Sequence, residues 1–120
     1  MRQIARALLY VGVAMMIGAA AGCTKIAPPT PLAQLNSQQL RGYYAFHTYC
    51  SQCHHDRTNE VLNGPALRGI FKKQYLDSGA PANDERVMDT MLYGRGKMPA
   101  VGRNIAPDDR LDLLAYLHTL

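Results

Sequence analysis

The 120-residue sequence contains no tryptophan, only three cysteines and no cluster of five or more basic residues. Its formal charge of +4 falls to +2 when the count starts at Cys23, because Arg2 and Arg6 precede that position. A net charge this small does not indicate a nucleic acid or an anionic membrane as a partner. With 48% hydrophobic and 18% charged residues, the composition is that of one globular domain and excludes a collagen, a coiled coil or a disordered chain.

The sequence also lacks an apolar run long enough for a permanent membrane span. The run Ala7–Ala21 has 15 apolar or small residues, whereas a transmembrane helix needs about 20. Because Arg2 and Arg6 stand before this run, residues 1–22 are predicted to be a secretory signal peptide. The expected location of the exported protein is the bacterial periplasm.

Two cleavage sites compete at the end of this segment. Ala19-Ala20-Ala21 offers an A-x-A site, after which Cys23 would be an ordinary thiol. Ala20-Ala21-Gly22-Cys23 instead resembles a bacterial lipobox, in which the cysteine is acylated, although Ala20 stands where that motif usually has leucine. We favour the lipobox, which predicts that a lipid anchor on Cys23 holds the protein at a membrane. The three prolines within residues 23–36 then predict a stiff, extended tether.

No segment after the tether has a convincing strand pattern, whereas three segments have the apolar spacing of helices. The first begins at Ser37, which is predicted to be its cap. The second is capped by Asn83 and ends at Gly94, and the third has Pro107 at its first position. We therefore expect an all-α domain over residues 37–120.

The third predicted helix is apolar on more than one side, through Leu111, Leu113, Leu114, Tyr116, Leu117 and Leu120. Such a helix is expected to pack on more than one side. A domain of about 85 residues buries only about 60–65% of its unfolded surface, so something besides the chain has to complete the core.

The chemistry is concentrated in Cys50-Ser51-Gln52-Cys53-His54, a C-x-x-C-H motif typical of c-type haem attachment. Thiols three residues apart on a helical turn reach the two vinyl groups at one porphyrin edge, and the adjacent histidine ligates the iron. A redox-active pair would need a thioredoxin-like context, a zinc site would need further ligands at a usable spacing, and a disulfide would form only without haem. We predict one covalent haem c, with thioether bonds at Cys50 and Cys53 and His54 as an axial ligand.

Met98 is predicted to be the second axial ligand. Its loop, Gly94-Arg95-Gly96-Lys97-Met98-Pro99, has glycines that let the backbone approach a flat cofactor, and Pro99 keeps Met98 out of the helical region. Met88 and Met91 are interpreted as core residues on a helix. The weaker alternatives for this ligand are His47, His55 and His118.

These residues resemble those of class I, monohaem cytochromes c of the bacterial periplasmic branch. Gly42, Phe46 and Cys50 keep the Gly-x₃-aromatic-x₃-Cys spacing of that family, and Leu113–Leu117 is similar to its C-terminal helix. The resemblance implies three main helices around one covalent haem. It also implies that the first and last helices cross at Gly42, where Phe46 meets Leu113 and Tyr116.

The segment Gly64–Phe71 is similar to the one that follows the haem motif in the same family. The resemblance implies that the carbonyl of Pro65 accepts a hydrogen bond from Nδ1–H of His54 and that Leu67 packs on the histidine face of the haem. Since tryptophan is absent, another donor has to bind the haem propionates. The candidates left open are Arg68, Lys72, Lys73 and Tyr75.

An iron with two protein ligands and four pyrrole nitrogens has no open position for a small-molecule substrate. We therefore expect a one-electron carrier of the respiratory chain that cycles between Fe(II) and Fe(III), and not an enzyme. Its partners would be redox proteins: a dehydrogenase or quinol-oxidising complex as donor and an oxidase or reductase as acceptor. One alternative is a dedicated electron-accepting subunit of a periplasmic dehydrogenase or oxidase complex. A haem-based gas sensor is a weaker one.

Overall fold

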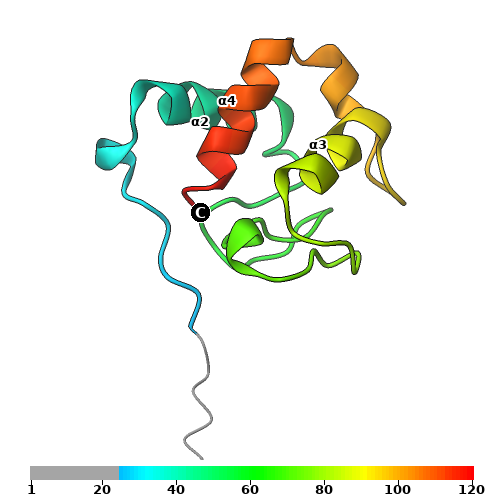
Figure 1. Ribbon diagram of the computed structural model, residues 1–120, viewed down its shortest axis with the longest axis horizontal. Coiled ribbons are helices and arrows are strands. Elements are labelled where there is room, and N and C mark those ends of the chain that lie inside the picture. Colours follow the sequence, from blue (N-terminus) through cyan, green and yellow to red (C-terminus); the bar gives the residue numbers. More distant parts are fainter. Residues whose placement is uncertain (1–24) are drawn as a thin grey trace, which may run out of the picture.

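The computed structural model describes residues 25–120, which form helices joined by loops and short 3-10 turns (Figure 1). Helix α2 is Ser37–Tyr49, α3 is Asp84–Tyr93 and α4 is Pro107–Leu117. The 3-10 turns are η1 (Leu32–Gln34), η2 (Ile70–Lys72) and η3 (Val101–Asn104). No strand occurs in this part of the chain, and the predicted all-α cytochrome c fold is confirmed.

The predicted signal peptide, residues 1–22, and the predicted lipidation site, Cys23, lie outside the described residues. Within residues 25–120, none of the helices combines the length and the apolar character that crossing a bilayer requires.

The start of α2 differs by one residue from the prediction. Asn36, and not Ser37, is the cap, because its side chain accepts a hydrogen bond from the Gln39 amide at 2.9 Å. The Gln39 side chain in turn accepts from the Asn36 amide at 3.0 Å, which completes a capping box. Both Asn and Ser are good caps, and the glutamine three residues after Asn36 decides between them.

The other two helix starts agree with the prediction. Asn83 caps α3 by accepting from the Arg86 amide at 2.9 Å, and α3 ends at Gly94, whose φ of 72° lies in the region that favours glycine. Pro107 occupies the first turn of α4, where its missing N–H costs no hydrogen bond.

Helices α2 and α4 cross at Gly42, as the resemblance implies (Figure 1). A Cβ atom on Gly42 would lie 1.9 Å from the carbonyl oxygen of Asp112 and 2.7 Å from Cβ of Tyr116. Only glycine permits this approach of the two backbones. Phe46 and Tyr116 are buried beside the crossing, with ring centroids 6.0 Å apart.

Helix α4 is buried on more than one side, although Leu111 does not take part. Leu113, Leu114 and Leu117 are buried, whereas Leu111 is 56% exposed. Leu111 lies on the solvent side of an otherwise covered helix.

The predicted tether is not free of the domain. The Thr30 amide donates to the carbonyl oxygen of Thr119 at 2.7 Å, and Nη2 of Arg57 donates to the carbonyl oxygen of Thr30 at 2.7 Å. Nearer the N-terminus, the Lys72 ammonium donates to the carbonyl oxygen of Ala27 at 3.3 Å. This stretch therefore lies against the folded domain as far back as residue 27.

Candidate haem site

One cavity of about 580 Å³ brings together the residues that the sequence singles out. Its walls include Cys50, Cys53, His54 and Met98, and Leu67 lines it as well. This volume lies within the range of about 300–1,000 Å³ that is usual for ligand and cofactor sites. Most of the remaining wall is apolar and comes from η2, the loop after it, α3 and α4: Ile70, Leu76, Val87, Met91, Leu113 and Leu117.

The two cysteines enter the cavity from the turn that ends α2. The amides of Cys53 and His54 each lie 3.0 Å from the carbonyl oxygen of Cys50, so the whole motif is one tight turn. Both cysteines are free thiols in the structure, and no disulfide joins them. Two sulfur atoms on one turn are therefore available at one edge of the cavity.

Burial, with a smaller contribution from Cys53, raises the pKa of the Cys50 thiol to about 11. Structural zinc sites have four ligands, which the cysteine pair alone does not supply. Moreover, no three His, Cys, Asp or Glu side chains between residues 25 and 120 gather as a metal site would require. The zinc alternative for the cysteine pair therefore gains no support.

The ring of His54 is held by the loop that follows the motif. Its Nδ1 lies 2.8 Å from the carbonyl oxygen of Pro65. A Cβ atom on Gly64 would lie only 2.4 Å from Cε1 of the ring, so the absence of a side chain at this position makes room for it. The Gly64 amide donates to the carbonyl oxygen of Cys53 at 2.7 Å, which ties the loop to the motif. Sequence reasoning had included Gly64 only as part of a similar segment.

Leu67 is positioned by its backbone. Its amide donates to the carbonyl oxygen of His55 at 2.8 Å, and its side chain lines the cavity. The loop therefore brings Leu67 to the same cavity as His54.

Met98 reaches the cavity from a narrow loop. Its amide donates to the carbonyl oxygen of Arg95 at 2.9 Å, and the Arg95 amide donates to the carbonyl oxygen of Met98 at 3.0 Å. A Cβ atom on Gly94 would lie 2.5 Å from that Met98 oxygen, so glycine allows the loop to close. Met91, interpreted from the sequence as a core residue, is buried and also forms part of the cavity wall.

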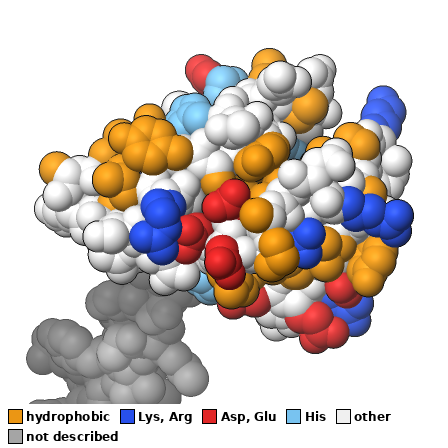
Figure 2. Space-filling view, turned by 90° about the horizontal axis from the view of Figure 1, so that it is seen from above, with side chains coloured by type: hydrophobic (Ala, Val, Ile, Leu, Met, Phe, Trp, Pro, Cys, Tyr) orange, Lys and Arg blue, Asp and Glu red, His pale blue; other side chains and the backbone are white. Residues whose placement is uncertain are grey.

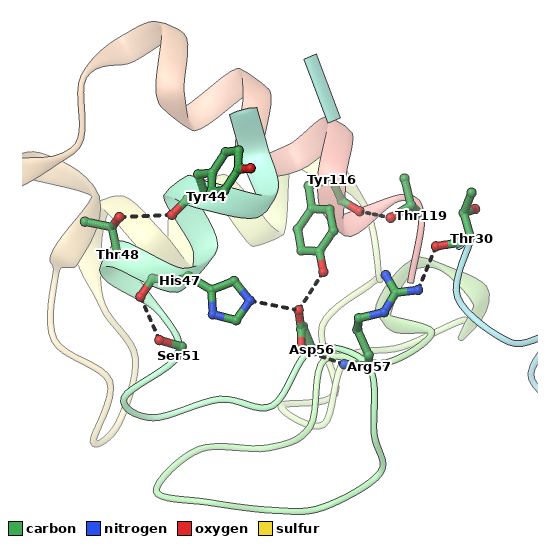
Figure 3. Close-up of polar contacts among 9 residues, drawn as sticks. All are labelled: Thr30, Tyr44, His47, Thr48, Ser51, Asp56, Arg57, Tyr116 and Thr119. Carbon is green, nitrogen blue, oxygen red and sulfur yellow. Dashed lines mark hydrogen bonds and ion pairs between the residues drawn. The ribbon is translucent and has the colours of Figure 1, made fainter. Parts of the chain in front are cut away.

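A cluster of polar side chains around Asp56, two residues after His54, was not predicted from the sequence (Figure 3). The Tyr116 hydroxyl donates to Oδ2 of Asp56 at 2.5 Å, and the Arg57 amide donates to Oδ1 of Asp56 at 2.8 Å. His47 points at the same carboxylate, with its Nε2 3.9 Å from Oδ2. Burial and the hydrogen bond to Asp56 raise the pKa of Tyr116. The cluster ties the residues that follow His54 to α2 and α4.

The four candidates for the haem propionates are not equally placed. Only Lys73 lines the cavity, while the Lys72 ammonium binds the carbonyl oxygen of Ala27 and the Tyr75 side chain is 53% exposed. Arg68 is not among the cavity residues. Arg95, which the sequence analysis did not consider for this role, does line the cavity.

The residues present fit a haem: two thiols on one turn, a histidine with one ring nitrogen already engaged, a methionine in the same cavity and apolar walls. The family model for cytochrome C oxidase, cbb3-type, subunit III matches residues 37–117. The chain belongs to this family of c-type cytochromes. No curated protein matches the chain.

Haem c, covalently bound, is therefore the cofactor of this cytochrome, and haem-based electron transfer is its activity. The matched residues run from the start of α2 to the end of α4, so that the family match covers the complete wall of the cavity.

Proposed function

We propose that this cytochrome is a one-electron carrier of the bacterial periplasm. In this proposal Cys50 and Cys53 form the thioether bonds, and His54 and Met98 are the axial ligands. The observation that carries it is the convergence of these four side chains on one largely apolar cavity. Bound there, haem c supplies an iron that changes between Fe(II) and Fe(III).

The residues of the chain would hold that iron in one geometry. The carbonyl of Pro65 engages Nδ1 of His54 and so leaves Nε2 as the nitrogen for the metal. The apolar wall, including Leu67 and Leu113, limits the access of water. If Met98 supplies the second protein ligand, no coordination position would remain for a substrate, which supports a carrier over an enzyme.

A permanent subunit of a larger complex is the second candidate. The description of the matched family names a subunit of an oxidase, and this favours stable association with an oxidase complex over free diffusion. Figure 2 shows acidic and basic side chains interspersed with apolar ones on the face seen from above, with no field of a single sign. Such a surface supports close, short-range docking with a redox partner and little long-range steering.

Size distinguishes the two candidates. Gel filtration of membranes solubilised in mild detergent separates proteins by size. If the protein is a carrier, its haem absorbance should elute at the size of the small cytochrome alone. Elution together with the haem of a larger complex would favour the subunit. Carbon monoxide binding by the reduced protein at neutral pH would favour the gas sensor.

Attachment to the membrane through a lipidated Cys23 is part of the proposal. The motif that ends at Cys23 and the apolar run before it support this attachment. Replacement of Cys23 by alanine should abolish labelling by a palmitate analogue and release the cytochrome from membranes. Unchanged membrane association would instead favour an uncleaved signal anchor.

A further inference from the structure

Residues 26–30, called the strap from here on, are fixed to the domain at both ends. Thr30 is the only residue from Pro28 to Pro31 that has a backbone N–H, and this N–H donates to the carbonyl oxygen of Thr119. The carbonyl oxygen of Thr30 accepts from Arg57, which follows the haem motif (Figure 3). The strap thus joins the haem-motif segment to the end of the chain.

The N-terminal end of the strap is also docked. A Cβ atom on Gly69 would lie 2.4 Å from Cγ2 of Ile26, so the Ile26 side chain rests directly on the backbone there. Gly69 has a φ of 68°, which favours glycine at this contact. Next to it, Lys72 binds the carbonyl oxygen of Ala27. The domain therefore holds its own leader as far as residue 26.

Little chain is left between the strap and the proposed anchor. Cys23 precedes Ile26 by three residues. Because an extended chain spans at most about 3.6 Å per residue, the two Cα atoms lie within about 11 Å of each other. A docked strap converts a long tether into a short one, so the end of the domain that carries Ile26 stays close to the anchor.

We propose that the face carrying Ile26 and Lys72 rests on the lipid surface to which the chain is attached. The inference rests on the proposed membrane attachment. Lys25 and Lys72 place positive charge at this end of the strap, where anionic headgroups would be nearest. The charge of the whole domain does not matter for this contact, because charges farther away than about 10 Å are screened.

This contact sets the direction in which the haem site faces. Figure 1 shows the strap and the Met98 loop at opposite sides of the domain. With the strap face on the bilayer, the loop that carries Lys97 and Met98 is on the side turned away from it. Redox partners would then reach the methionine side of the haem from the aqueous phase. A partner held in the same membrane would need a domain that projects from the bilayer.

Lysine labelling of the intact haem protein tests the contact. The acylated protein in vesicles of phosphatidylethanolamine and phosphatidylglycerol is compared with the released Cys23→Ala protein in the absence of vesicles, and acetylation at each lysine is measured by mass spectrometry. We expect Lys72 to be labelled several-fold more slowly in the attached protein. Lys97 should be labelled equally in both.

Two threonine variants separate the strap from the anchor. Thr30→Pro keeps an extended backbone but removes the N–H that Thr119 accepts, and it should raise the attached-to-released labelling ratio of Lys72 towards one. Thr30→Ala keeps that N–H and should leave the ratio as in the parent. The absorbance of the haem, unchanged in both variants, shows that the domain is folded.

The outcomes distinguish this inference from the one on which it rests. Attached protein with equal labelling of Lys72 in both forms, or with protection of Lys97 in its place, overturns the proposed orientation and leaves the anchor intact. Wild-type protein that is absent from membranes overturns the anchor and the orientation together. Equal ratios for Thr30→Pro and Thr30→Ala overturn the role of the strap.

The affinity of the protein without its lipid for anionic vesicles provides a second measurement. Lys72→Gln in the Cys23→Ala background should bind the same vesicles about fivefold less tightly, as expected for one basic residue at an anionic surface. The matched Lys97→Gln variant should bind as its parent does. A larger loss for Lys97→Gln would place the wrong face on the membrane.

Discussion

The two sides of the haem cavity are built in different ways. On the histidine side, Gly64 and Pro65 enclose the ring of His54, and Tyr116 holds Asp56 two residues beyond it. The Pro65 contact spans 11 residues and the Tyr116 contact spans 60. The histidine side is therefore fixed by the tertiary structure.

The methionine side depends mainly on its own loop. Met98 and Arg95 exchange two backbone hydrogen bonds, and Gly94 lies against the Met98 carbonyl. One further link, from Arg95 to the carbonyl oxygen of Ser78, is long at 3.5 Å. A ligand held by a local loop is lost more easily than one held by packing between distant segments, so the methionine bond should be the first to break.

The largest effect should come from removing the covalent links on the histidine side. Cys50→Ala/Cys53→Ala should lose the haem peroxidase stain on denaturing gels and most of the native helical circular dichroism, because the haem completes the core. Cys23→Ala is the control and should keep both signals. Stain that persists in the double variant would contradict the covalent attachment through these cysteines.

Breaking the methionine side should leave the haem in place. Met98→Ala should give high-spin or water-ligated ferric haem and a lower reduction potential. Met91→Ala removes a buried side chain from the same cavity, so it should cost about 2–5 kcal/mol of stability and keep the low-spin spectrum. Absorbance spectra and potentiometric titration of the two variants distinguish these outcomes. High-spin haem in Met91→Ala and low-spin haem in Met98→Ala would assign the ligand to Met91.

Substitutions at two glycines compare the histidine side with the methionine side of the cavity. Gly64→Ala inserts a methyl group against His54 and should both disturb the haem spectrum and cost about 1–3 kcal/mol. Gly96→Ala meets open space and should cost only about 1–2 kcal/mol for its left-handed backbone, at φ 56°. Urea unfolding of the haem protein gives both values. A larger spectral change in Gly96→Ala would mean that the loop, and not the histidine side, is the rigid one.

Tyr116→Phe keeps the buried ring but removes the bond to Asp56. It leaves a carboxylate oxygen without its donor and should cost about 1–3 kcal/mol. Tyr44→Phe, on the exposed face of α2, should change stability by less than about 0.5 kcal/mol. Equal unfolding midpoints in urea for the two variants would show that the Asp56 cluster does not support the histidine side.

The smallest effect should appear at the crossing of α2 and α4. The hydrogen bond from Arg41 holds the pKa of Asp112 below its ordinary value. A lowered pKa in the folded state stabilises the fold above the unfolded value, near 3.9, and this contribution is lost as the pH falls through the folded pKa. Asp112→Asn should therefore be destabilising at neutral pH and progressively less so in acid. Urea unfolding measured at a series of pH values checks this, and a destabilisation that stays constant into acid would contradict it.

The sequence was sufficient to predict structural features that depend on a single residue and its neighbours. Asn83, Gly94 and Pro107 each mark a helix end through their own backbone chemistry, and all three were predicted correctly. The start of α2 was missed by one residue because Asn36 and Ser37 are both good caps, and the choice depends on the side chain of Gln39.

The contacts that could not be predicted join distant segments. Tyr116 and Asp56 are 60 residues apart, and neither lies in a pattern that indicates the other. The hydrogen bond from Thr30 to Thr119 could not be predicted for the same reason. A proline-rich stretch indicates a free tether unless the surface that it contacts is known. The roles of Cys50, Cys53, His54 and Met98 remain predictions, now supported by their convergence on one cavity.

The position of α4 in the cavity wall has a consequence for how the protein matures. Leu113 and Leu117 close one side of the cavity, and they belong to the last helix of the chain. Because the chain is made from its N-terminus, the cysteine motif emerges well before this helix does. The chain order therefore leaves a period in which both thiols are open on the side that α4 later covers. Haem ligation and helix docking can thus follow one another as separate steps of biogenesis.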